Sequence, residues 1–170
     1  YLHKRRESSL IMKLKLSLIL CFLITAFSLQ AQTEKEALSK LSFMIGNWKG
    51  TSFSFSEKGT KSIEVSEDVA YKMNGSLVVL DVKSPWIELH TIISYSVKDQ
   101  CYYYHPFSKK GLRDKYKSNF EDNVFRVYFS KERRLTFTLT KEGFFHEFGE
   151  NLKNGKWEKY FEDILKPVQK

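Results

Sequence analysis

The chain has 170 residues, with 28 lysines and arginines against 20 aspartates and glutamates, which gives a formal net charge of +8. Hydrophobic residues make up 42% of it and charged residues 28%, an ordinary globular composition that excludes collagen-like, low-complexity and polytopic membrane chains. Two cysteines are too few for a scaffold held together by disulfides. The fold must therefore be stabilised by a hydrophobic core.

The first 31 residues are predicted to be a targeting sequence rather than part of the fold. Met12 opens a short basic segment, an apolar run follows over 16–29, and Ala31 supplies the small residue of a cleavage site. This order is typical of a secretory signal peptide, and the apolar run is too short to span a bilayer. We therefore expect 1–11 to be an upstream extension, 12–31 a signal peptide and 32–170 a single exported domain, periplasmic or extracellular.

The leader also accounts for half of the net charge. It holds five basic residues and one acid, so the 139 residues from Gln32 onward carry a net charge of +4. That surplus is too small for a nucleic-acid-binding surface, and we expect no nucleic-acid partner. We also expect no stable membrane anchor once the leader is removed. Cys101 is the only cysteine after the leader, which leaves no intrachain disulfide.

One helix is expected, at the start of the exported domain. Thr33 stands three residues before Glu36, which is the spacing of a capping box, and apolar residues then recur at helical spacing as far as Ile45. After Gly46 the pattern changes to β-branched and aromatic residues that alternate with polar ones. This change predicts that the rest of the chain consists of strands.

About ten short strands follow, separated by turn signals every 8–15 residues or so. The strongest signals are Asn74-Gly75 and Asn154-Gly155, because a type I′ turn needs positive φ at both central residues. Within strands the alternation is clear: Phe125 and Val127 face one way and Arg126 the other. The pattern predicts an all-β domain, an antiparallel up-and-down β-barrel of about ten strands with a short N-terminal helix.

A closed barrel is favoured because it removes the exposed edges that a flat meander of strands would present to other chains. A β-sandwich is the alternative. A barrel of this size has an interior wide enough to hold a small ligand where side chains do not fill it.

Several segments of the chain resemble those of a known group of barrels. The short helix followed by Gly46-Asn47-Trp48 resembles the entry of lipocalin-like (calycin) barrels. Further similar segments are His90, Ile93-Ser94-Tyr95, Phe148-Gly149-Glu150, Asn154-Gly155-Lys156-Trp157, Phe161-Glu162 and Leu165-Lys166. Over 38–166 the chain resembles the calycin-like family of exported bacterial proteins of unassigned function. The resemblance implies a fold, an exported location and a structural plug of the barrel made by Gly46 and Trp48, but no activity.

Three candidate ligand-binding residues share one face of a strand. If the face of Trp86, Glu88 and His90 lines the barrel, these side chains form a polar and aromatic patch that could orient the head group of a ligand. The alternative is that this face meets solvent, which is favoured because alternation normally turns the apolar set, including Leu89 and Ile93, toward the core.

Two more candidates lie elsewhere. Arg126 could pair with a carboxylate inside the barrel. The resemblance to nitrobindin-like haem barrels makes His146 the nearest candidate for an axial ligand, against the alternative that it is simply packed among aromatic residues. The histidines, cysteine and acids show no metal-ligand spacing, so we expect no metal site. No cofactor is predicted, with haem left open.

The rest of the chain offers no catalytic signature. It lacks a nucleophile elbow, a Gly-rich phosphate loop and a His-Glu-x-x-His motif. The predicted function is binding of a small hydrophobic or amphipathic molecule in the barrel interior, without catalysis. Two alternatives stay open: a haem-dependent or isomerase-type enzyme on the same barrel, and a filled barrel that acts as a protein-interaction domain.

Overall fold

The structure, a computed structural model, describes residues 33–112 and 114–168. The predicted upstream extension and signal peptide lie outside the described residues. The described part contains its own core, because its buried hydrophobic residues run from Ala37 near its start to Leu165 near its end. No helix within it is long and apolar enough to cross a bilayer.

The predicted N-terminal helix is confirmed. It begins as α2 (Glu34–Ser39) and tightens into the 3₁₀ helix η1 (Lys40–Met44). Its capping box is formed: Thr33 Oγ1 accepts a hydrogen bond from Glu36 N at 3.2 Å, and Glu36 Oε2 accepts one from Thr33 N at 2.9 Å. Its apolar face is completely buried and is made of Ala37, Leu38, Leu41 and Met44.

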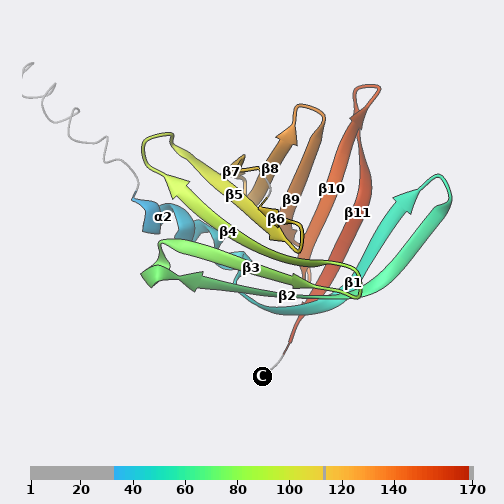
Figure 1. Cartoon of the computed structure of the whole chain (residues 1–170), viewed down its shortest axis with the longest axis horizontal. Helices are drawn as coiled ribbons and strands as arrows, with labels where there is room; N and C mark the ends of the chain where they lie inside the picture. Colours follow the sequence, from blue (N-terminus) through green and yellow to red (C-terminus); the bar gives the residue numbers. More distant parts are fainter. Residues whose placement is uncertain (1–32, 113, 169–170) are drawn as a thin grey trace, which may run out of the picture. The chain divides into compact units, whose positions relative to one another are not determined.

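Eleven strands follow the helix, and ten of them close a ring. The strands are β1 (Gly46–Ser56), β2 (Gly59–Lys72), β3 (Leu77–Lys83), β4 (Glu88–Ser96), β5 (Cys101–Ser108), β6 (Gly111–Leu112), β7 (Tyr116–Glu121), β8 (Val124–Ser130), β9 (Arg133–Leu139), β10 (Phe145–Lys153) and β11 (Lys156–Pro167). They pair antiparallel in the order β4-β3-β2-β1-β11-β10-β9-β8-β7-β5, and a β4–β5 pairing closes the ring (Figure 1). The short β6 pairs only with the end of β5. The predicted barrel is confirmed, and the sandwich alternative is wrong.

The pairing of the first strand with the last joins the two ends of the chain within the ring. Thr51 of β1 lies opposite Ile164 of β11. A Cβ atom on Gly50 would lie only 2.1 Å from the carbonyl oxygen of Ile164. The missing side chain at this position therefore lets the two strands approach closely enough to pair.

The two strongest turn signals differ in outcome. Asn154 and Gly155 have φ of +51° and +75° and join β10 to β11 directly, as predicted. The Asn74-Gly75 signal lies in a longer connection, the 3₁₀ turn η2 (Met73–Gly75), because Met73 also adopts positive φ. Strand alternation holds, since Phe125 and Val127 are fully buried.

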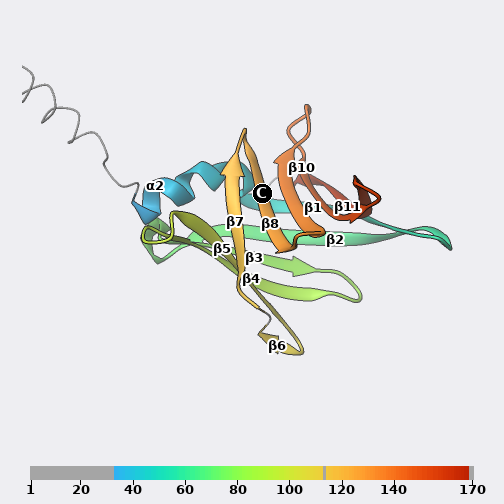
Figure 2. The same cartoon turned by 90° about the horizontal axis from the view of Figure 1, so that it is seen from above.

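The two ends of the barrel are built differently. Figures 1 and 2 show α2 near one end of β3 and β4, and the turn that joins these two strands at their other end. We call the first the helix end. The second, which carries the β3–β4 and β5–β6 turns, is the rim end.

Candidate functional site

Three acidic side chains meet inside the barrel, and we call them the carboxyl cluster. They are Glu67 of β2, Glu147 of β10 and Asp163 of β11, and one oxygen from each lies within 4.8 Å of the others. Their exposed fractions are 2%, 8% and 5%. Each stands two residues from a buried apolar residue of the same strand, so alternation turns all three toward the core; these neighbours are Val65, Val69, Phe145 and Leu165.

The cluster has fewer hydrogen-bond donors than its carboxyl oxygens need. Both carboxyl oxygens of Glu67 and Oδ1 of Asp163 are buried without a partner. On the flanking strands Glu67 lies opposite Trp48 and Val82, and the indole N–H of Trp48 is already donated to the carbonyl oxygen of Met44 at 2.8 Å. A buried polar group left unpaired costs about 1–3 kcal/mol. The cluster is therefore an arrangement that a proton or a cation would stabilise.

Burial makes the cluster hold protons. It raises the pKa of Glu67 to about 8, and the charge of Asp163 adds to the shift. Burial also raises the pKa of Glu147 well above its ordinary value. It raises the pKa of Asp163 to about 6, against the effect of a hydrogen bond from Ser52. A protonated Glu147 can donate to Glu67, and without that proton Glu67 has no donor.

Hydroxyl groups and apolar side chains complete the surroundings. The Tyr104 hydroxyl accepts a hydrogen bond from Thr91 Oγ1 at 3.5 Å, and burial raises its pKa with a further contribution from Glu147. Tyr104 is therefore protonated at neutral pH. Partly buried apolar residues also pack against the core: Val82 lies directly opposite Glu67, and the others are Tyr116, Phe129 and Phe161.

The structure places the predicted patch of Trp86, Glu88 and His90 on the outside of the barrel. Trp86 is 76% exposed, Glu88 Oε2 pairs with Lys109 Nζ at 3.1 Å, and His90 Nδ1 lies 2.6 Å from Asp81 Oδ1. Glu88 and His90 line a surface depression of about 310 Å³. The solvent-facing alternative therefore describes this face, and ligand binding by these residues stays a prediction.

Arg126 and His146 also lie on the outer face. Arg126 stands between Asn119 and Thr136 of the neighbouring strands, out of phase with the fully buried Phe125. His146 Nε2 lies 2.7 Å from Glu162 Oε1. In that position His146 does not fit an axial ligand of a haem inside the barrel, and neither residue joins the carboxyl cluster.

Gly46 and Trp48 lie where the helix enters the barrel. Trp48 is 7% exposed, and its ring stacks on Phe145 with centroids 5.3 Å apart. A Cβ atom on Gly46, which has φ of +153°, would lie 3.3 Å from the Trp48 ring. These contacts agree with the structural role that the resemblance implies.

Sequence reasoning missed the carboxyl cluster. Its local signal is that acids occupy the apolar phase of their strands: Glu67 stands between Val65 and Val69, and Asp163 between Phe161 and Leu165. The meeting with Glu147 and Asp163 depends on strand pairing between distant parts of the chain, which spacing along the sequence does not show.

Comparison with known protein families finds no match, and comparison with curated proteins finds none. The class of protein is therefore defined by its geometry. It is a closed antiparallel β-barrel, compatible with a calycin-like fold, that carries three carboxyl groups in its interior.

Proposed function

We propose that the protein is an exported, calycin-like binding protein whose barrel interior takes a small amphipathic molecule with a cationic group. The observation that carries the proposal is Glu67, which is 2% exposed, has two carboxyl oxygens without partners and lies beside Glu147 and Asp163. A cationic group would supply both the missing donors and the missing positive charge. A primary ammonium suits the cluster because its three N–H donors match three carboxyl groups.

The apolar part of such a ligand has a suitable wall. Val82, Tyr116, Phe129 and Phe161 are only partly buried; Val82 lies beside Glu67, and Phe161 stands two residues from Asp163 toward the β10–β11 turn. A ligand that enters from the rim end would place its charged group on the cluster and its apolar part against these side chains. This order of polar and apolar contacts is typical of small-molecule sites.

A divalent metal ion is the second candidate, and the spacing of the oxygens favours it. Ca²⁺ binds oxygen at about 2.3–2.6 Å, so ligands on opposite sides of the ion lie about 4.6–5.2 Å apart. The cluster oxygens lie within 4.8 Å of one another. A site made only of carboxyl oxygens suits hard cations such as Ca²⁺ or Mg²⁺.

Native mass spectrometry tests the proposal. Residues 32–170 would be purified without denaturation from exporting cells, beside Glu67→Gln. We expect an added mass that is lost on denaturation and absent from the variant; an organic mass supports the amphipathic cation, and the mass of a metal ion supports the second candidate. Glu64→Gln is the matched control, because Glu64 lies on the same strand with a side chain 80% exposed.

If the ligand is lost during purification, adding a candidate ligand and measuring the melting temperature tests the proposal instead. We expect dodecylamine or CaCl₂ to raise the melting temperature of the wild type and of Glu64→Gln more than that of Glu67→Gln. The effect should grow as pH rises toward the pKa of Glu67, about 8, because cation binding must displace the protons of the cluster. Equal shifts in all three proteins, or no shift with either compound, would contradict the proposal.

A further inference from the structure

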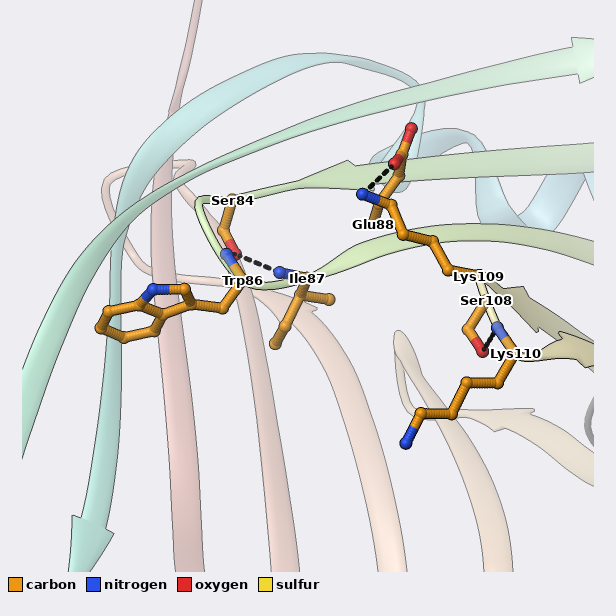
Figure 3. Close-up of polar contacts among 7 residues, drawn as sticks. All are labelled: Ser84, Trp86, Ile87, Glu88, Ser108, Lys109 and Lys110. Carbon is orange, nitrogen blue, oxygen red and sulfur yellow. Dashed lines mark hydrogen bonds and ion pairs between the residues drawn. The ribbon is translucent and has the colours of Figure 1, made fainter.

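The β3–β4 turn at the rim end presents two apolar side chains to solvent. Trp86 is 76% exposed and its neighbour Ile87 is 47% exposed. The turn is well held, since Ser84 Oγ accepts a hydrogen bond from Ile87 N at 3.0 Å and Ser84 N donates to the Ile87 carbonyl at 2.8 Å. Figure 3 shows the Trp86 indole extending away from the turn.

Lysines lie next to the turn in sequence and on the neighbouring turn. Lys83 precedes the turn, and Lys109 and Lys110 lie in the neighbouring β5–β6 turn, since Leu89 pairs with Ser108. Lys109 Nζ pairs with Glu88 Oε2 at 3.1 Å, which neutralises the acid closest to the turn. Figure 3 shows Lys110 extending away from that pair. Among the described residues, neither Lys83 nor Lys110 forms an ion pair.

This combination fits the surface of an anionic bilayer. Tryptophan is enriched at the membrane–water interface, where its ring meets the headgroup region and its N–H meets polar groups. Lysines close to an anionic surface add about 1 kcal/mol each. Met73, in the η2 turn at the helix end, is also 74% exposed, and it stands beside Lys72, but no exposed tryptophan among the described residues accompanies it there.

We propose that the rim patch, formed by Lys83, Trp86, Ile87, Lys109 and Lys110, docks the barrel reversibly onto anionic lipid bilayers. Trp86 and Ile87 enter the headgroup region, and the free ammonium groups contact lipid phosphates. Two apolar side chains give weak, reversible binding, which agrees with the absence of a stable anchor expected from the sequence. Docking would also bring the rim end to the membrane, where an amphipathic ligand is exchanged; that last step rests on the proposed function.

Vesicle flotation tests the docking without any ligand. Residues 32–170 contain every buried core residue that the structure describes and leave out the apolar run over 16–29, which could bind lipid by itself. They are mixed with vesicles of phosphatidylcholine alone, or of phosphatidylcholine and phosphatidylglycerol in equal parts. We expect binding to the anionic vesicles only, weakened by added salt as screening predicts. We expect the double variant Trp86→Ser/Ile87→Ser to bind at least tenfold more weakly, and Lys110→Glu to bind more weakly as well.

Met73→Ser is the matched control, because the Met73 side chain is about as exposed as that of Trp86. It lies at the helix end, away from the rim patch, so this variant should bind vesicles like the wild type. Lipids brominated in their acyl chains should quench the fluorescence of the wild type and not that of Trp86→Phe. The proposal is overturned when anionic vesicles fail to bind at low salt, or when the double variant binds as the wild type does. It is also overturned if the patch instead pairs two copies, seen as a dimer that the double variant loses in the absence of lipid.

Discussion

Glu67 occupies a position that its strand otherwise gives to apolar side chains. Val65 and Val69 on either side are buried in the core, and Glu67 itself is 2% exposed. A valine there would avoid the cost of burying a carboxyl group without donors. Natural proteins commonly give up stability in this way at binding sites, and Glu67 occupies a position of that kind.

The raised pKa of Glu67 predicts a loss of stability at high pH. Its pKa rises from 4.5 to about 8 on folding. The stabilising contribution is therefore complete below the unfolded pKa and is lost as pH rises through the folded pKa. Each proton held only by the folded state lowers the free energy of unfolding by up to about 1.4 kcal/mol per pH unit. We expect Glu67→Gln to reduce this slope, as measured by urea denaturation over a series of pH values.

Glu64→Gln, on the exposed face of the same strand, should keep the slope of the wild type. The pKa of Asp163 rises from 3.8 to about 6, so Asp163 also makes the free energy of unfolding fall with pH, in a lower pH range. Part of the pH slope should therefore remain in Glu67→Gln. If the free energy of unfolding of the wild type does not change between pH 4.5 and about pH 8, the unfolded and folded pKa values of Glu67, then the cluster is ionised inside the folded barrel.

The helix and the first strand depend on each other through one side chain. Trp48 follows η1 in the chain, donates its indole N–H to the Met44 carbonyl and stacks on Phe145 of β10. Two consecutive elements, η1 and β1, therefore meet the distant strand β10 at this ring. That arrangement makes Trp48 a structural residue at the helix end rather than part of a binding site.

We expect Trp48→Ala to lower the free energy of unfolding by about 3–5 kcal/mol, because it removes a large buried ring and leaves a cavity. Chemical denaturation followed by far-UV circular dichroism measures the loss. Trp86→Ala is the matched control; at 76% exposure its removal should change the free energy of unfolding by less than about 0.5 kcal/mol. Equal midpoints for Trp48→Ala and the wild type would show that the ring does not close the barrel.

The elements were predictable to the extent that they depend on local pattern. The capping box of Thr33 and Glu36 and the Asn154-Gly155 turn are formed by neighbouring residues, and both are confirmed. Alternation shows which residues share a face, but the inner face is fixed only when the barrel closes. The outward position of His146 and the inward position of Glu67 follow from that closure, so the site could not be predicted from spacing alone.

At the scale of the whole molecule, the ring is completed by contacts between the two ends of the chain. β1 pairs with β2 on one side and with β11 on the other. Without β11, β1 would be an exposed edge strand. Pairing between such distant segments must wait until much of the chain is ordered, which makes folding slow compared with that of a helical protein. The final strand is therefore the element on which closure depends.

A chain that ends at Asn154, before β11, tests this dependence. It loses the partner of both β1 and β10, together with Asp163 and the buried Leu165. Both exposed edges would be free to pair with other chains, so we expect aggregation and no cooperative unfolding transition by calorimetry. A chain that ends at Val168 is the control, because it keeps β11 and the hydrogen bond from Val168 N to the Asn47 carbonyl at 2.8 Å, and it should melt like the full domain. Cooperative melting of the shorter chain as a monomer would mean that β1 and β10 pair directly, and that the order of strands around the ring is set by the hairpins rather than by the final strand.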